Sequence, residues 1–239
     1  MRSVARGASH EYKKYKIKKH NSTEYRTIYH PTPRLKSLQR WLLRNVIESL
    51  PVHNAAFAYR KGVSIWDNAR MHARSNFLLR LDFRNFFESI SVADINTYIN
   101  ERPETFNSWS SDDIRLFCDV VTKGGALTIG APSSPALSNA LCYDLDLMID
   151  SYCQRQEIIY SRYADDLFFS TRRRDFLHSI ESEISQICSR LKSPSNLQLN
   201  GSKIRHSSKR GARRVTGIIL GSDEQTYVGR AVKRKPHSD

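Results

Sequence analysis

The residues best suited to chemistry are three aspartates, Asp82 at the end of one apolar run and Asp165-Asp166 between two others. Residues 157–162 and 167–171 are rich in β-branched and aromatic side chains and too short for helices, which predicts two strands joined by a tight hairpin. Carboxylates in so apolar a setting are costly unless a cation compensates, and Mg²⁺ prefers hard oxygen ligands. The alternative is a solvated turn, because aspartate is a common turn residue.

A third predicted strand, residues 77–83, carries Asp82. If it lies antiparallel beside the hairpin, Asp82 meets Asp165 and Asp166, and three such carboxylates need divalent cations to coexist. Two Mg²⁺ ions roughly 4 Å apart, as polymerases use them, would activate a primer hydroxyl and stabilise the leaving pyrophosphate. These residues alone therefore favour a metal-dependent phosphoryl-transfer enzyme.

Charge is segregated along the 239 residues, which carry a net charge of +14. Residues 1–40 carry +9 and residues 201–239 carry +7, whereas the stretch between them carries −2. This layout suits a polyanion held by basic flanks around an acidic, metal-holding centre, since phosphate neutralisation drives nucleic-acid affinity. Charge that served solubility alone would not require such segregation.

Helical periodicity and capping signals surround the predicted strands. Residues 1–20 lack a clear period and predict a partly ordered arm, whereas short strands are expected at 197–199 and 215–220 on either side of a basic loop. Ser134 is expected to cap a helix that has Pro135 as its first residue. Amphipathic or capped helices are predicted over residues 35–50, 64–72, 91–100, 111–123, 134–154 and 175–192.

The composition also limits cell location and redox state. No apolar run reaches 18 residues and no apolar segment follows the basic N-terminus, so we expect a cytoplasmic protein without a membrane partner. The four cysteines lack a CxxC spacing and are expected to be reduced core thiols: Cys118, Cys142, Cys153 and Cys188.

Five segments in order resemble one family, the retron-type bacterial reverse transcriptases. Three resemble the motifs of a reverse transcriptase palm: Leu81-Asp82-Phe83-Arg84-Asn85-Phe86-Phe87, Gly130-Ala131-Pro132-Ser133-Ser134-Pro135-Ala136-Leu137-Ser138-Asn139 and Tyr163-Ala164-Asp165-Asp166. Two more resemble signatures of the retron type, namely Asn68-Ala69-Arg70-Met71-His72 (NAxxH) and Val215-Thr216-Gly217 (VTG). The resemblance covers about residues 25–220.

The family implies an α+β fold, a right-hand polymerase palm and fingers with an antiparallel sheet and packed helices. In this chain, the thumb of that fold is expected to be truncated. The implied divisions are a basic N-terminal arm (1–24), a fingers region with the NAxxH segment (25–81), a palm (82–220) with a fingers insertion at about 96–125, and a basic tail or thumb remnant (221–239). Relatives continue into a helical thumb where this chain has 22 residues after Gly217. Residues 221–239 are expected to begin one helix at most.

The resemblance also assigns roles within the active site. Asp82 and Asp165 would be the main metal ligands for two Mg²⁺ ions, with Phe83 and Asp166 completing the metal site. Lys203 would lie near the pyrophosphate as a proton donor. The implied contacts with the dNTP come from Arg60 and Lys61 on the triphosphate, Phe87 as a steric gate against a 2′-OH, and Gly130, where the backbone approaches the nucleotide. The alternatives without a catalytic role are an exposed basic turn at Arg60-Lys61, a core aromatic at Phe87 and a surface lysine at Lys203.

The implied substrate is the enzyme's own structured noncoding RNA, primed from an internal 2′-OH and copied into branched single-stranded DNA, with an effector protein as partner in phage defence. Arginines in a loop suit folded RNA, which is recognised by shape and backbone. The expected RNA-binding residues are Asn68, His72, Lys209, Arg210, Arg213, Arg214, Val215, Thr216 and Gly217. Ile129 departs from the family pattern, which has glutamine before the motif glycine.

Two alternatives stay open at this point. The chain is either an active RNA-directed DNA polymerase or an RNA-binding scaffold or antitoxin built on a polymerase fold. Synthesis of RNA, or synthesis without a template, is disfavoured by Phe87.

Overall fold

The computed structural model describes residues 7–18 and 25–228, which form two compact units. The first unit combines segments 1–52, 85–144 and 190–197, and the second combines 53–84, 145–189 and 198–239. The division differs from the expected one: the NAxxH segment joins the aspartate-bearing strands, and the insertion into that unit begins at residue 85. Among the described residues, no helix is long and apolar enough to cross a membrane.

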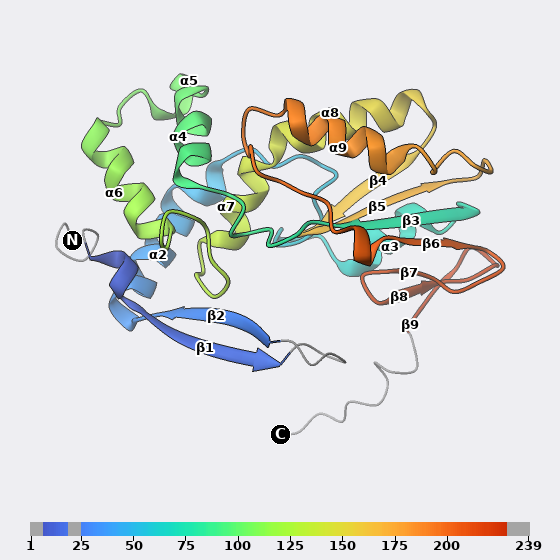
Figure 1. Ribbon diagram of the computed structural model, residues 1–239, viewed down its shortest axis with the longest axis horizontal. Coiled ribbons are helices and arrows are strands. Elements are labelled where there is room, and N and C mark those ends of the chain that lie inside the picture. The colour runs from blue at the N-terminus through green and yellow to red at the C-terminus, as the bar shows by residue number, and fades with distance from the viewer. Residues whose placement is uncertain (1–6, 19–24, 229–239) are drawn as a thin grey trace. The chain divides into compact units, whose positions relative to one another are not determined.

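The second unit is built on a four-stranded antiparallel sheet of order β4-β5-β3-β6 (Figure 1). Its strands are β3 (Phe77–Asp82), β4 (Ile159–Tyr163), β5 (Asp166–Thr171) and β6 (Arg205–Ser208). The three strands predicted around the aspartates are confirmed, and β6 adds a strand where a loop was expected. A strand at 197–199 is not formed, because only Leu199 bridges to Phe83.

Both faces of this sheet are covered, α8 and α9 lying on one side and α3 with a small second sheet on the other (Figure 1). The second sheet has the antiparallel order β7-β8-β9. These elements are α3 (Ile65–His72), α8 (Tyr143–Arg155), α9 (Ile180–Arg190), β7 (Arg213–Val215), β8 (Ile218–Leu220) and β9 (Thr226–Val228).

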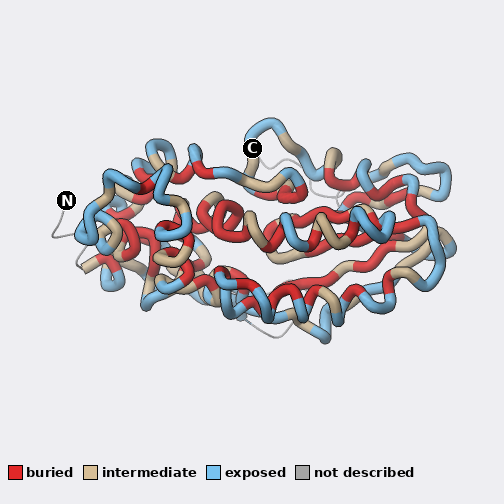
Figure 2. The backbone as a smooth tube through the Cα atoms, turned by 90° about the horizontal axis from the view of Figure 1, so that it is seen from above, coloured by how far each residue is buried: buried red, intermediate tan, exposed pale blue. Residues whose placement is uncertain are grey.

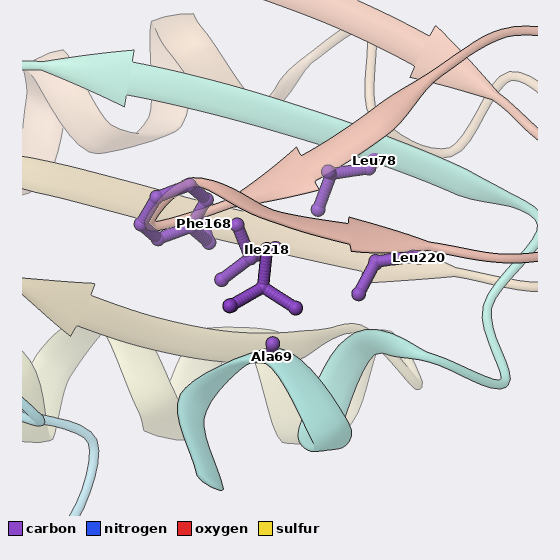
Figure 3. Close-up of a cluster of buried hydrophobic side chains, with 6 residues drawn as sticks. Ala69, Leu78, Phe168, Ile218 and Leu220 are labelled. Atoms are coloured by element: carbon purple, nitrogen blue, oxygen red, sulfur yellow. The ribbon is translucent and has the colours of Figure 1, made fainter. Parts of the chain in front are cut away.

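A hydrophobic cluster joins the two retron signatures to the main sheet. Ala69 of α3 packs with Leu78 of β3 and Phe168 of β5, and with Val215, Ile218 and Leu220 of the small sheet (Figure 3). All six side chains are at least 96% buried. The NAxxH and VTG segments therefore meet through apolar packing, which is the main source of local stability for such short elements.

The first unit contains a β-hairpin and five helices among its described residues. β1 (Tyr12–Lys18) pairs antiparallel with β2 (Tyr25–Pro31), so the expected N-terminal arm is wrong for residues 12–18; residues 1–6 and 19–24 lie outside the described residues. The helices are α2 (Pro33–Asn45), α4 (Val92–Asn100), α5 (Pro103–Phe106), α6 (Ser111–Val121) and α7 (Ser134–Leu141).

Capping explains where several helices begin. Ser64, Ser91 and Ser110 each accept a hydrogen bond from the backbone N–H three residues later, and an aspartate at that position bonds back to the serine. These capping boxes satisfy backbone donors at the helix N-terminus. The predicted starts at Ser64 and Ser91 are thereby confirmed, and the helix predicted from residue 111 has Ser110 as its N-cap.

Other predicted boundaries shift. The helix predicted over 134–154 is two helices, because the chain turns at Cys142 between α7 and α8, and Pro135 is the second helical residue instead of the first. The C-terminal strand is a hairpin around Thr216 and Gly217, both with positive φ. Residues 226–228 form β9 in place of the expected helix. The four cysteines are buried, as predicted, and none of them forms a disulfide within the described part of the chain.

Burial follows these elements closely. Figure 2 shows buried residues in long stretches through strands and inward helix sides, with exposed residues gathered at turns and on outer helix sides. In the main sheet, residues 167–171 of β5 are buried without a break. A strand covered on both faces has this uniform burial, and it explains the continuous apolar run seen in the sequence.

Candidate active site

The aspartate hairpin has the geometry that the sequence predicts, with one change in detail. Asp82 and Asp166 face each other as register partners of β3 and β5. The backbone N–H of Phe83 donates to the carbonyl oxygen of Asp165 at 3.0 Å. Only Ala164 and Asp165 make the turn, Ala164 with a φ of 57°, whereas Asp166 already belongs to β5. The pairing therefore brings the three aspartates to one end of the sheet.

Asp82 is held by Lys203. The Lys203 Nζ lies 2.8 Å from both carboxylate oxygens of Asp82, whose side chain is only 2% exposed. The approach is fixed by the backbone, because Asn200 donates its N–H to the Asp82 carbonyl at 2.8 Å and a 3₁₀ turn over Gly201–Lys203 follows. A buried carboxylate requires such a partner. The sequence-predicted Lys203 thus lies at the aspartate site.

Asp166 is held by Arg80, a residue that the sequence reasoning missed. The guanidinium donates from Nε and Nη2 to Oδ1 at 3.0 and 2.8 Å, and from Nη2 to Oδ2 at 2.9 Å. Burial nevertheless raises the pKa of Asp166 to about 6, against the lowering by Arg80, and the charges of Asp165 and Asp82 raise it further. Position 80 was detectable, since it lies two residues before Asp82 and therefore on the same face of β3.

The donor set fits a hard divalent cation in kind, since three converging carboxylates offer oxygen ligands only. The neighbouring charges of Asp165 and Asp82 contribute to the raised pKa of Asp166. Within the described ranges, however, no group of three or more acidic, histidine or cysteine side chains is arranged to hold a metal ion. Lys203 contacts both carboxylate oxygens of Asp82, and Arg80 contacts both of those of Asp166.

A buried ion pair supports the hairpin from the other face of the sheet. Arg162 of β4 donates from Nε and Nη2 to the carboxylate of Asp146 on α8 at 2.8 and 2.6 Å, both side chains being 0% exposed. Tyr160 donates its hydroxyl to the same carboxylate at 2.8 Å, and Arg162 Nη1 donates to the Ala164 carbonyl at 3.2 Å. Asp146 therefore holds Arg162 in place, and Arg162 in turn donates to the Ala164 carbonyl in the hairpin turn. The sequence signal for this pair was one charged residue within each of two apolar segments, Arg162 in β4 and Asp146 in α8.

The NAxxH side chains lie inside the unit. His72 bonds to Ser170 at 2.7 Å through Nδ1 and to Ser161 at 2.8 Å through Nε2, and Ser161 donates to Asn68. Burial lowers the pKa of His72 to about 3, so its imidazole is neutral at pH 7. Asn68 and His72 are 0% exposed. Contrary to expectation, this arrangement leaves them no surface for RNA and makes them a bridge between α3 and the strands that carry Asp165 and Asp166.

The expected RNA-binding segment divides in the same way. Arg213 is buried and donates to the carbonyls of Ser75 and Gly221, and Val215 lies in the hydrophobic cluster. These two side chains hold the small sheet and, in this arrangement, do not face RNA. The expected RNA-binding side chains that stay at or near the surface are Lys209, which pairs with Glu224 at 3.4 Å, Arg210, Arg214, Thr216 and Gly217.

The expected dNTP-binding residues fall in both units. In the second unit, Arg60 donates to three backbone carbonyls, those of His53, Asn54 and Ala56, and Lys61 follows it at the surface. The Arg60 side chain thus holds together the loop that contains it. Phe87 and Gly130 belong to the first unit, where Phe87 is half-buried with its ring centroid 5.5 Å from that of Phe86.

Gly130 has a requirement of its own. Its φ is +109°, and a Cβ atom there would overlap the carbonyl oxygen of Tyr29 on β2. The neighbouring Ile129 accepts a hydrogen bond from the Tyr29 N–H at 2.9 Å. The glycine therefore permits close approach of the protein's own hairpin, a role that the side chain of Ile129 does not disturb.

Comparison with known proteins agrees with this geometry. The family model described as reverse transcriptase (RNA-dependent DNA polymerase) matches residues 17–229. The chain is 37% identical over 235 residues to the retron Ec83 reverse transcriptase of Escherichia coli, covering 96% of this chain and 74% of that protein. It is 36% identical over 236 residues to the retron Ec86 reverse transcriptase of Escherichia coli, covering 93% and 67%.

Telomerases are among the solved structures with a similar fold. Telomerase from Candida albicans in complex with the TWJ fragment of telomeric RNA has a TM-score of 0.60 at 11% identity, covering 90% of this chain and 46% of that one. Truncated apo telomerase from Candida tropicalis has a TM-score of 0.59 at 12% identity, covering 91% and 55%. The chain spans about half the length of these telomerases. The expected α+β polymerase palm-and-fingers fold is confirmed.

Family and fold thus coincide over nearly the whole chain, and the segments that carry the aspartates fall within the matched region. The chain belongs to the reverse transcriptase family of RNA-directed DNA polymerases, within which it is of the retron type.

Proposed function

We propose that the chain binds its own structured noncoding RNA, starts DNA synthesis from an RNA 2′-OH, and copies part of the RNA into branched single-stranded DNA. The observation that carries the proposal is the convergence of Asp82, Asp165 and Asp166 at one end of the β3–β5 pair. The retron relatives support the choice of template and product. The resemblance of the chain to retron reverse transcriptases also supports a role in phage defence, with an effector protein as partner. We place this activity in the cytoplasm.

We assign the catalytic metal site to Asp82 and Asp165, with Phe83 and Asp166 completing it. The site would hold two Mg²⁺ ions. Divalent cations at such carboxylates lower the pKa of the attacking hydroxyl and neutralise the leaving pyrophosphate. Lys203 blocks Asp82 in this structure, so it must release the carboxylate before a cation is held. Because its side chain is 48% exposed, solvent can take up the released ammonium at modest cost.

Release would give Lys203 its second role. Its ammonium is tethered by the Asn200–Asp82 backbone bond and stays within reach of the aspartates. We assign to it proton donation to the pyrophosphate as the phosphoryl bond breaks. The assignments of Arg60 and Lys61 to the triphosphate, of Phe87 to sugar discrimination and of Gly130 to the nucleotide follow the family resemblance.

RNA binding is assigned to the exposed part of the C-terminal region. Arg214 of β7 and Arg210, which precedes β7, are exposed, and the whole chain carries +14. Such charge favours the RNA backbone and makes binding salt-dependent. We expect the RNA and its RNA/DNA product to contact this surface, while Asn68, His72, Arg213 and Val215 support it from within.

The test is Mg²⁺-dependent incorporation of labelled dNTPs on the chain's own RNA. Asp165→Asn removes a charge from the metal site and should abolish incorporation, whereas Asp112→Asn, at an exposed carboxylate on α6, should leave it near the wild-type rate. Undiminished synthesis by Asp165→Asn would refute the assignment. Phe87→Ala should increase ribonucleotide incorporation if Phe87 excludes the 2′-OH.

One observation favours a second candidate, an RNA-binding scaffold or antitoxin. Lys203 and Arg80 already neutralise two of the three carboxylates, so the site is stable without a metal ion. The scaffold predicts tight RNA binding by the purified chain together with no incorporation on any primer. Incorporation that stops in Asp165→Asn would exclude it.

A further inference from the structure

A cavity of about 320 Å³ lies in the second unit, at the end of β3 that is remote from the aspartates. Its apolar lining comes from Phe77, Leu78 and Leu177. Phe77 is five residues before Asp82 on the same strand, which places the cavity roughly 17 Å from the carboxylates at about 3.4 Å per residue. The cavity is therefore separate from the catalytic end of the sheet.

The rest of the lining consists of one acid, Asp175, and six polar donors. They come from the β5–α9 segment and from the edge strand β6: Arg173, Arg174, His178, His206, Ser207 and Ser208. The rings of His178 and His206 have centroids 6.1 Å apart at an interplanar angle of 52°. Two imidazoles, two guanidiniums and two hydroxyls around an apolar floor combine hydrogen-bond donors with surfaces on which a planar ring can stack.

The acidic partners of this lining are weakly held. Arg173 lies 3.1 Å from Glu157, and Arg174 lies 3.8 Å from Asp175, which also lies 3.9 Å from His178. The Arg174 side chain is 84% exposed and that of Glu157 is 75% exposed. Exposed pairs of this kind contribute little stability, so a phosphate can replace either carboxylate at small cost.

We propose that this cavity binds one unpaired nucleotide of RNA, the base lying over the apolar floor and the flanking phosphate bound by Arg174 and the two histidines. A pocket of a few hundred Å³ suits a ligand of that size. The proposal deepens the RNA-binding part of the proposed function by naming a second contact, remote from the aspartates. It accounts for the Arg172-Arg173-Arg174 run, which no part of the proposed catalytic site uses.

A nucleotide within a strand fits better than a free one because the basic surface continues beyond the cavity. β6 is the edge strand of the sheet, and the exposed Arg205 and Arg210 lie at its two ends. Phosphates on either side of the bound nucleotide would meet these arginines. A free mononucleotide would use the cavity alone.

The test measures the affinity of the full chain for a fluorescein-labelled ten-nucleotide single-stranded RNA, and separately for AMP. Ser208→Phe fills the cavity without changing its charge, and Arg174→Ala removes an exposed guanidinium without disturbing the core. Arg155→Ala, at an exposed arginine of α8, removes the same charge outside the cavity and is the matched control. Thermal unfolding checks that each variant is folded.

Because stacking of one base contributes about 1–3 kcal/mol, Ser208→Phe should weaken RNA binding roughly five- to 150-fold. Arg174→Ala should weaken it more than Arg155→Ala does. Equal RNA affinity of Arg174→Ala and the Arg155→Ala control, or of a folded Ser208→Phe variant and wild type, would overturn the proposal. AMP binding that is lost in Ser208→Phe while RNA binding is unchanged would overturn the RNA assignment in favour of a free nucleotide. Synthesis by the wild-type chain on oligo(dT)-primed poly(rA) is measured independently, so a failure of the proposed catalytic function is distinguishable.

Discussion

The ion pair between Arg162 and Asp146 should dominate the stability of the second unit. Both side chains are 0% exposed, and they share two hydrogen bonds of 2.6 and 2.8 Å. Arg162→Met leaves the Asp146 carboxylate buried without its cation, while the Tyr160 hydroxyl still donates to it. Asp146→Leu leaves the guanidinium without its counter-charge. Each single change therefore creates an uncompensated buried charge.

Breaking such a pair from one side costs about 3–5 kcal/mol. In a chain of this size 1 kcal/mol shifts the melting temperature by roughly 2–4 °C, so each single variant should melt about 6–20 °C below wild type. The double variant Asp146→Leu/Arg162→Met has no charge at either of these two buried positions and loses mainly the hydroxyl partner of Tyr160, about 1–3 kcal/mol. It should therefore be more stable than either single variant.

The assay is thermal and urea unfolding of wild type, both single variants and the double variant, analysed as a double-mutant cycle. The control cycle removes Arg115 and Asp112, an exposed pair 62% and 70% accessible on α6, where each change should cost less than about 1 kcal/mol. Costs that simply add in the Arg162–Asp146 cycle would refute the reasoning, since they would show that the two charges do not compensate each other.

Three further predictions concern single positions. Burial lowers the pKa of His72 in the folded chain to about 3, so the unfolded chain binds more protons between pH 6.5 and pH 3. The free energy of unfolding should therefore fall as pH falls through that window, by up to about 1.4 kcal/mol per pH unit. The urea midpoint of His72→Gln should depend less steeply on pH than that of wild type. Gly130→Ala should cost roughly 1–3 kcal/mol and increase proteolysis of the β1–β2 hairpin, because its Cβ would overlap Tyr29; unchanged stability would contradict the close approach. Arg213→Ala should lower the melting temperature by leaving buried carbonyls without donors, whereas Arg214→Ala should leave the melting temperature unchanged and weaken RNA binding; the reverse pattern would show that burial misassigns the two arginines.

The sequence predicted the part of the site that depends on local patterns. The apolar runs around Asp82 and Asp165 gave strands, and antiparallel pairing of those strands placed the carboxylates together. The capping boxes at Ser91 and Ser110 were readable because donor and acceptor lie three residues apart. In each case the interacting residues are close in sequence or are fixed by the two-residue period of a strand.

What sequence reasoning missed depends on contacts between distant segments. The strand over Tyr12–Lys18 has lysine at four of its seven positions and was predicted to be part of a partly ordered arm, yet it pairs with β2 along its length. Asn68 and His72 looked like RNA ligands because polar residues on a helix are usually exposed. Their partners Ser161 and Ser170 lie about 90 or more positions away, so no local pattern shows that the polar groups are satisfied within the core.

Two cationic side chains, those of Arg80 and Lys203, explain how a cluster of three aspartates is compatible with folding. Three ionised carboxylates at one end of a sheet repel each other and are costly to bury, as the raised pKa of Asp166 indicates. Arg80 and Lys203 offset that cost in different ways. The Arg80 guanidinium is bidentate and lies on the neighbouring strand, whereas Lys203 reaches Asp82 from a short turn with a half-exposed side chain.

This difference yields a last prediction. Since Lys203 is the cation that must yield to a metal ion at Asp82, Lys203→Met should leave a buried charge, destabilise the metal-free chain and make its melting temperature depend more strongly on Mg²⁺ than that of wild type. Arg80→Met should destabilise the chain with a smaller gain from Mg²⁺, because Asp166 is proposed only to complete the site. Thermal unfolding in 0–20 mM MgCl₂, with CaCl₂ as a comparison, measures both responses. Equal Mg²⁺ responses in the two variants and wild type would show that Lys203 does not compete with a metal ion for Asp82.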